Sequence, residues 1–328
     1  ISGLGWYRLD SFLSVLDRLL LIFVCGALLL IPYFRRQFRI EWFVFAQSAT
    51  LLLTALVAYW LLRGRRRRRW SFRWRPPLLW LTLRESAPYA LIVFLMTVYT
   101  RIDGVMIERL HPRGLLEADV YAAAYRLLDA SNMLGFLFAG LLFPMFARLL
   151  GKGAPVAPLL RLGFQSLWAG AAALAAATIV FRVPIMEALY FDADAYSGQL
   201  LGWLMTTFLA ASGAYVFGTL LGAAGVLRAM NAVALAGVVL NIALNWRLIP
   251  PYGALGAAWA TCATQFLVFF GQVLVARRSL ELPPAPGLVA RLAIYTAITF
   301  LLSLAFFRLE VGAWPGRYLA AIGLCLPA

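Results

Sequence analysis

The chain has 328 residues, of which 63% are hydrophobic and only 13% are charged, and its mean hydropathy is +0.83. A soluble domain of this size needs more charge on its surface, so the composition excludes a soluble globular protein and indicates an integral membrane protein. The formal net charge is +15, but the basic residues flank apolar runs as membrane topology signals do, and nucleic acid is therefore not an expected partner.

Ten apolar runs follow one another along the chain, and each is predicted to be a membrane-spanning helix. Crossing a hydrocarbon core of ~30 Å takes about 20 residues of helix. The runs cover residues 12–33, 41–62, 84–108, 119–147, 161–182, 199–226, 229–249, 254–276 and 289–309, with a tenth starting near 316. The expected fold class is an all-α polytopic membrane helix bundle.

A basic segment follows the second run and sets the expected orientation. It contains five consecutive arginines, Arg65–Arg69. Because cytoplasmic loops are enriched in Lys and Arg, the loop 63–77 is predicted to be cytoplasmic. The surrounding segment 63–83 is expected to be a linker between two helical bundles, residues 1–62 and 84–328, and its arginines are expected to contact anionic lipid head groups.

Side chains suited to metal binding or covalent catalysis are scarce. The three cysteines, Cys25, Cys262 and Cys325, lie in separate apolar runs, and the single histidine is His111. This pattern argues against a disulfide framework and against the usual zinc sites, so neither a metal nor a cofactor is expected. A membrane-embedded polymerase or ligase of sugar chains would need a large outer loop, which the sequence lacks, so an enzyme is not expected.

The third and fourth runs carry the densest cluster of charged side chains. Arg101 and Arg126 each lie about seven residues from the outer end of their run, hence ~10 Å deep at 1.5 Å per residue. Asp103 and Asp129 lie within a turn of these arginines. Ionisable residues inside spans are costly and are functional candidates. Two pairings are allowed, Arg101 with Asp129 or Asp103 with Arg126, and such pairs either only fix helix packing or line a cavity.

Tyrosine and asparagine side chains extend this polar surface. Tyr125, Asp129 and Asn132 fall at positions i, i+4 and i+7, which predicts one polar stripe on an otherwise apolar helix. Tyr99 and Asp103 share a face of the preceding helix. A polar cavity lined by arginine would suit a diphosphate, because the guanidinium group binds phosphate oxygens in a bidentate manner.

Two other polar pairs lie outside this cluster. Arg18 follows Asp17 in the first run, where it is a further cavity candidate but can also extend its charge to the interface. Asn241 and Asn245 fall at positions i and i+4, so they share one helix face, and hydrogen bonding between helices is their expected role.

Three stretches carry a resemblance to a known family. Residues 85–110 read ESAPYALIVFLMTVYTRIDGVMIERL, and residues 120–148 read VYAAAYRLLDASNMLGFLFAGLLFPMFAR. Together they resemble the start of the second lobe in oligosaccharide flippases of the polysaccharide biosynthesis family. Residues 215–261 read YVFGTLLGAAGVLRAMNAVALAGVVLNIALNWRLIPPYGALGAAWAT. They resemble the family's later signature, in which a helix with paired asparagines ends in Leu-Ile-Pro before a glycine-rich turn.

The resemblance implies a two-lobed exporter fold of the superfamily that also includes multidrug extruders. Residues 1–62 would be the end of the first lobe, which would be incomplete, and residues 84–328 the second lobe. Arg101 and Arg126 would match, by location, the cavity arginines that hold the lipid diphosphate. The expected substrate-binding residues are Arg18, Tyr99, Arg101, Asp103, Tyr125, Arg126, Asp129 and Asn132.

The expected function is to flip an undecaprenyl-diphosphate-linked oligosaccharide across the bacterial inner membrane by alternating access. Its partners would be the lipid-linked oligosaccharide and membrane lipids, with a proton or sodium gradient as a candidate source of energy. The alternative is a cation-coupled multidrug antiporter of the same fold, in which Asp103 and Asp129 carry protons or sodium ions.

Overall fold

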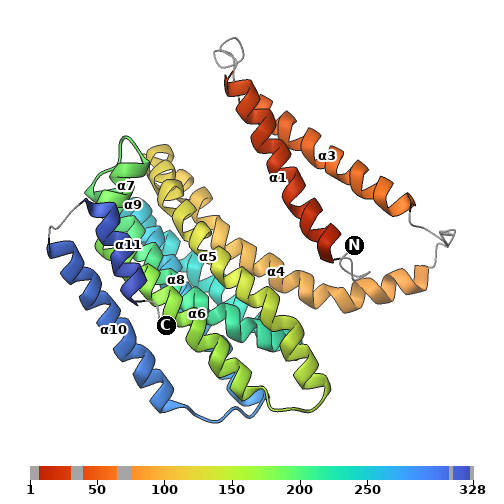
Figure 1. Ribbon diagram of the computed structural model, residues 1–328. Helices are drawn as coiled ribbons and strands as arrows, with labels where there is room; N and C mark the ends of the chain where they lie inside the picture. Colours follow the sequence, from red (N-terminus) through yellow and green to blue (C-terminus); the bar gives the residue numbers. More distant parts are fainter. Residues whose placement is uncertain (1–6, 31–39, 65–75, 310–312, 326–328) are drawn as a thin grey trace. The chain divides into compact units, whose positions relative to one another are not determined.

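The computed structural model of the protein (Figure 1) describes residues 7–30, 40–64, 76–309 and 313–325. All regular secondary structure in these residues is helical, and each predicted apolar run overlaps a helix. The predicted fold class, an all-α polytopic membrane helix bundle, is confirmed. The chain divides into two compact units, Ile1–Pro76 and Pro77–Ala328. Their assignment to two lobes of an exporter stays a prediction.

In its described residues, the first unit contains two helices that pack against each other, α1 (Tyr7–Leu30) and α3 (Ile40–Gly64). Both are strongly apolar. Most of the basic loop 63–77, including Arg65–Arg69, lies outside the described residues, so its cytoplasmic orientation and its linker role stay predictions.

The second unit is a bundle of longer helices. In chain order they are α4 (Pro76–Leu110), α5 (Gly114–Gly151), α6 (Ala157–Val180), α7 (Arg182–Leu189), α8 (Ala195–Ala223), α9 (Leu227–Ser279), α10 (Pro286–Arg308) and α11 (Trp314–Cys325). Across the described parts of both units, seven helices are long and apolar enough to cross a membrane: α3, α4, α5, α6, α8, α9 and α10. The short helix α7 was not separated from its neighbours in the sequence.

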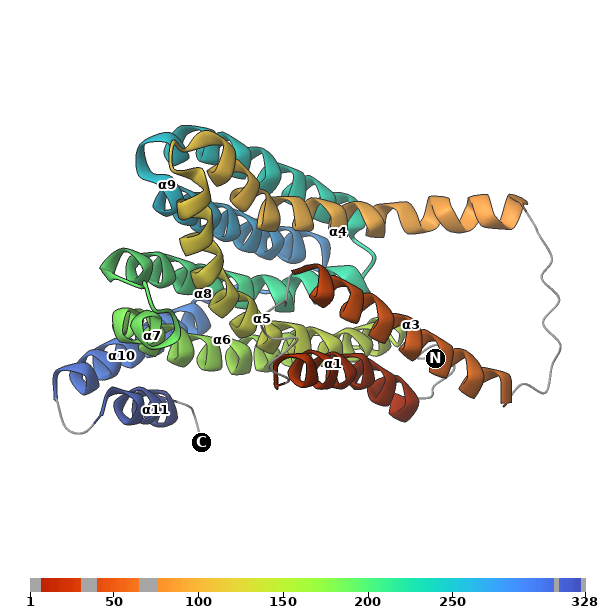
Figure 2. The same ribbon diagram turned by 90° about the horizontal axis from the view of Figure 1, so that it is seen from above.

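Helix α9 is a hairpin of two antiparallel halves, residues 227–252 and 254–279 (Figure 2). The reversal occurs at Gly253, whose φ of 58° and ψ of −135° are non-helical. The halves pack closely, because a Cβ atom at Gly237 would lie only 2.9 Å from the Val268 side chain. The two separate runs predicted for this region are therefore confirmed.

Helix α8 occupies the middle of the second unit, where it packs against α5, α6 and α9. Small residues allow this close packing. A Cβ atom at Gly135 of α5 would overlap the ring of Tyr215 on α8, and the alanines of α6 between Ala171 and Ala177 are almost fully buried. In a bilayer such small-residue surfaces bring helices into close van der Waals contact.

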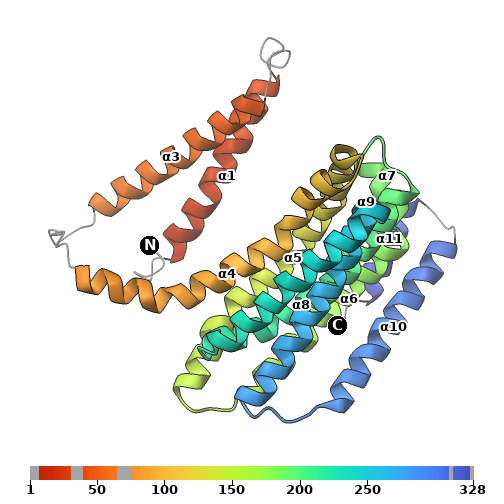
Figure 3. The ribbon, with the colours of Figure 1, turned by 180° about the vertical axis from the view of Figure 1, so that it is seen from behind.

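The connections of the second unit alternate between its two ends (Figures 1 and 3). We call the first end the one that contains connections 111–113 and 190–194. The second end contains connections 152–156 and 280–285. Gly253 turns at the first end, and α10 and α11 lie along one side of this unit.

Candidate functional site

Among the described residues, the most deeply buried acidic side chain is Asp103 of α4, which is 1% exposed. Its Oδ2 atom accepts hydrogen bonds from the hydroxyls of Tyr121 (2.8 Å) and Thr261 (2.5 Å). Its Oδ1 atom accepts hydrogen bonds from the side-chain amides of Asn245 (2.7 Å) and Asn241 (3.2 Å). We call these five residues the Asp103 cluster.

The hairpin of α9 explains how residues so distant in sequence reach one carboxylate. Asn245 and Thr261 each lie eight residues from Gly253 on opposite halves of α9. At 1.5 Å per residue both are about 12 Å from the turn, so they sit at the same depth. Tyr121 is two turns into α5, which begins at the same end of the unit.

The four donors to Asp103 are neutral. No ion pair involves this carboxylate in the part of the chain that the structure describes. The Oδ1 atom of Asn245 is buried beside it without a hydrogen-bond partner, while Oδ1 of Asn241 accepts from Asn245. The cluster therefore places a carboxylate beside an unpaired amide oxygen, and oxygens of these two kinds are ligands that a hard cation prefers.

A second charged group lies nearby on the same pair of helices. The guanidinium of Arg101 donates to both carboxylate oxygens of Asp129, at 3.0 and 3.2 Å, and lies 5.3 Å from the ring centroid of Tyr125. The two side chains are 59% and 39% exposed. Of the two pairings that the sequence allowed, this one forms. Asp103 does not pair with Arg126, because its hydrogen-bond partners are the neutral donors of the Asp103 cluster.

The remaining predicted site residues of α4 and α5 differ in their surroundings. Tyr99 is buried in the apolar core, and the Tyr125 hydroxyl donates to the Thr100 carbonyl at 2.8 Å. Asn132 has a buried side-chain oxygen without a hydrogen-bond partner. Arg126 is exposed and, among the described side chains, forms no ion pair.

Arg18 belongs to the first unit and lies 3.6 Å from Asp17, with 73% of its own side chain exposed. The exposure agrees with a side chain that extends its charge away from the helix. The site residues of the second unit are therefore gathered around α4 and α5, while Arg18 stays a separate candidate.

Sequence reasoning missed four members of the Asp103 cluster as site residues. The i, i+4 spacing of Asn241 and Asn245 predicted a shared face and hydrogen bonds to another helix, and both amides donate to Asp103. Their partner was not predicted, nor were Tyr121 and Thr261. The available signal was the coincidence of this asparagine pair with a buried acidic residue of another helix.

Glu117 forms a distinct contact at the first end. Its Oε2 atom accepts hydrogen bonds from the Tyr196 hydroxyl (2.5 Å) and from the backbone N–H of Ala254 (2.9 Å). Ala254 is the first residue after the turn at Gly253. The carboxylate therefore caps the second half of α9, where unpaired N–H groups and the helix dipole favour a negative charge.

The described residues contain no group of three or more His, Cys, Asp or Glu side chains that could hold a metal ion. The chain matches no protein-family model, and no curated protein matches it. Fold and site together define a polytopic α-helical membrane protein with a buried carboxylate that pairs with no basic side chain of the described residues. Any particular function is to be argued from this site, because one fold hosts many functions.

Proposed function

We propose that the protein is a transporter that flips an undecaprenyl-diphosphate-linked oligosaccharide across the bacterial inner membrane by alternating access. The observation that carries the transport class is the Asp103 cluster. A carboxylate inside a membrane bundle is costly, and such residues mark ion pathways and substrate sites. Structural pairing alone is a poor explanation here, because the neighbours of Asp103 are neutral and one buried acceptor is left unpaired.

The cluster would couple transport to a proton or sodium gradient. Its donors come from α5 and from both halves of the α9 hairpin, so loading or unloading a cation at Asp103 would change the contacts among three segments. A change in charge at a junction of helices is a means of biasing two conformations of a bundle. Discontinuous helices that line ion sites are a common feature of secondary transporters.

Two arginines on α4 and α5 support an anionic substrate group. Arg126 has no acidic partner among the described residues, and Arg101 is held in a bidentate pair with Asp129. A guanidinium group binds the oxygens of a phosphate in a bidentate manner, as Arg101 binds the Asp129 carboxylate. In the proposed cycle Arg101 exchanges Asp129 for the diphosphate, while Arg126 adds a second cation and the lipid tail remains in the bilayer.

The second candidate is a cation-coupled multidrug antiporter of the same fold. It is favoured by one observation: Asp103 carries no arginine partner, whereas Arg101 is already paired with an acid. Under this alternative, Asp103 exchanges protons or sodium ions for organic cations, and Arg126 has no role in binding the substrate.

Reconstitution separates the two candidates. The full-length protein is placed in liposomes that contain a lipid-diphosphate-linked oligosaccharide, and the appearance of the sugar on the opposite leaflet is followed over time. Arg126→Gln should reduce flipping strongly, whereas Arg109→Gln, an exposed arginine at the end of α4, should not. Equal rates of flipping by the two variants would contradict the proposal that Arg126 binds the diphosphate. No flipping at all, together with ion-driven efflux of organic cations, would establish the antiporter.

A further inference from the structure

An aromatic cavity lies apart from the Asp103 cluster, between α6, α8, the second half of α9 and α10. Its volume is about 700 Å³, within the usual range of about 300–1,000 Å³ for ligand pockets. Phe164 and Trp168 of α6 line it together with Phe217 of α8 and Phe269 of α9. The Trp168 indole also donates to Thr296 at 3.1 Å, which ties α6 to α10 beside the cavity.

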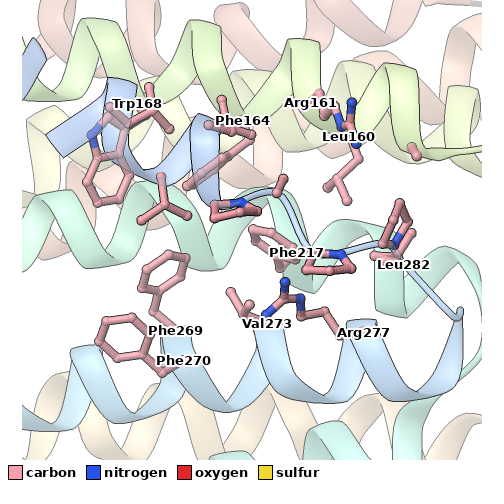
Figure 4. A pocket seen from close by; sticks show the side chains of 18 of the residues that line it. Leu160, Arg161, Phe164, Trp168, Phe217, Phe269, Phe270, Val273, Arg277 and Leu282 are labelled. Atoms are coloured by element: carbon pink, nitrogen blue, oxygen red, sulfur yellow. The ribbon is translucent and has the colours of Figure 1, made fainter. Parts of the chain in front are cut away.

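The cavity is amphipathic along its length (Figure 4). Trp168, Phe269 and Phe270 lie toward one end of the view and Arg161 toward the other, while the guanidinium of Arg277 lies between them, near Phe217 and Val273. This polarity follows from the chain, because Arg161 is in the second turn of α6 and Arg277 is in the last turn of α9. Both helix ends belong to the second end of the unit, where head groups rather than acyl chains would be found.

The two arginines are available for an anion. Both are exposed, and in the described ranges neither forms an ion pair or a side-chain hydrogen bond. The connection 280–285 closes the cavity on this side with Pro283 and Pro284, which have no backbone N–H to offer. The guanidinium groups of Arg161 and Arg277 are the charged groups that line the cavity.

We infer that this cavity binds an anionic phospholipid of the membrane, with its phosphate at Arg161 and Arg277 and one acyl chain along the aromatic wall. Charge complementarity selects this occupant. Basic pockets between transmembrane helices recognise anionic lipid head groups, and apart from the two arginines the lining of the cavity is almost entirely apolar. Burial of the chain alone would not select a lipid, because the surrounding bilayer is equally apolar. This site is separate from the transport proposal and does not depend on it.

Native mass spectrometry of the full-length protein in detergent tests this inference. The protein is incubated with phosphatidylglycerol or phosphatidylcholine of identical chains, and the occupancy of each lipid is measured. We expect a clear preference for phosphatidylglycerol. At about 1 kcal/mol per arginine, removing each arginine should lower that preference roughly fivefold.

The decisive variants are the pair Arg161→Gln with Arg277→Gln, compared with Arg148→Gln with Arg278→Gln. The control pair removes the same charge at the same end of the unit from two exposed arginines that do not line the cavity. The preference should disappear only in the first pair. Equal loss in both pairs, or no preference in the unaltered protein, would overturn the inference.

A second variant tests the apolar end without changing charge. Ala293 of α10 lines the cavity, whereas Ala297, one turn later, does not. Ala293→Phe should reduce phosphatidylglycerol binding and Ala297→Phe should leave it unchanged. Stronger retention of a polyprenyl phosphate than of phosphatidylglycerol by the unaltered protein would assign the cavity to an isoprenoid chain, and would also overturn the phospholipid.

Discussion

At the scale of single residues, Asp103 is surrounded by hydroxyl and amide donors instead of a basic partner. Hydrogen bonds to an ionised group are stronger than those between neutral groups, about 1.5–3 kcal/mol each. The cluster can therefore stabilise a charge inside the bundle without an arginine. In the proposed function this allows a bound cation to leave again, which a permanent salt bridge with arginine would prevent. An ion-coupling residue requires this combination.

The substitution Asp103→Asn should abolish the dependence of transport on an ion gradient. It removes the charge and turns one acceptor oxygen into an NH₂ group that faces other donors, so we also expect a loss of about 1–3 kcal/mol in stability. Transport in liposomes with and without proton and sodium gradients measures the first effect. Glu108→Gln, an exposed carboxylate on the same helix, is the control, and equal ion dependence in both variants would contradict the assignment.

A double-mutant cycle on Arg101 and Asp129 reports what surrounds that pair. If the pair faces a water-filled cavity, the coupling energy between Arg101→Gln and Asp129→Asn should not exceed about 1 kcal/mol, as for exposed ion pairs. The measurement is the thermal stability of the single and double variants in detergent and in nanodiscs. A much larger coupling in nanodiscs would indicate that the pair faces lipid, and would remove it from the proposed cavity.

The sequence predicted which residues carry charge within the spans but not all of their partners. Arg101 and Asp129 lie at similar depths along two antiparallel helices, and so do Asp103 and Arg126, so the sequence allowed either pairing. The rotation of the helices about their axes decides which pair forms, and depth alone does not give it. Tyr121 and Thr261 are 18 and 158 residues away from Asp103. Their meeting depends on the three-dimensional packing of α9 against α4 and α5, which hydropathy does not encode.

At the scale of secondary-structure elements, hydropathy located the helices well because a bilayer imposes both length and polarity. The reversal within α9 was predicted as a break between two runs, since Pro250, Pro251 and Gly253 interrupt the apolar pattern. The short helix α7 was missed because eight residues are too few to span a membrane. The cap that Glu117 provides for α9 was missed because the two are far apart in sequence.

Gly253→Ala should destabilise the protein. The positive φ is unfavourable for a residue with a side chain, at about 1–3 kcal/mol, and the new Cβ atom would lie 2.5 Å from the Glu117 carboxylate. A lower melting temperature in detergent is the expected readout. Gly140→Ala, within helix α5 and with open space around it, should be neutral or stabilising. Equal melting temperatures for the two variants would contradict the positive φ of Gly253 and its close contact with Glu117.

Loss of the cap at the same turn should also be measurable. Glu117→Ala removes the acceptor for Ala254 and Tyr196, and we expect a loss of about 0.5–2 kcal/mol, as for other helix N-caps. Asp119→Ala is the matched control, because Asp119 is two residues along the same helix and exposed. Hydrogen exchange at the start of the second half of α9 should increase only in the Glu117 variant. Unchanged exchange there would contradict the capping role.

At the scale of the whole molecule, the alternation of connections between two ends predicts opposite sides of a membrane. Single cysteines at Lys152 and Ser279 should react with an impermeant thiol reagent from one side, and cysteines at Arg113 and Asp192 from the other. All three native cysteines are replaced beforehand. Because basic residues gather near the second end, we expect that end to face the cytoplasm. Labelling of all four positions from one side would contradict the spanning arrangement.

The hairpin of α9 also bears on how the chain is made. A single non-helical residue joins its two halves, so there is no hydrophilic loop that could wait on either side while one half is placed. We expect residues 227–279 to leave the translocation machinery as one unit. Ribosome-bound chains that end shortly after residue 252 should be extracted by alkaline carbonate more readily than chains extended past residue 279. During synthesis, the first half of α9 would then be held in the membrane only after the second half, residues 254–279, has been made.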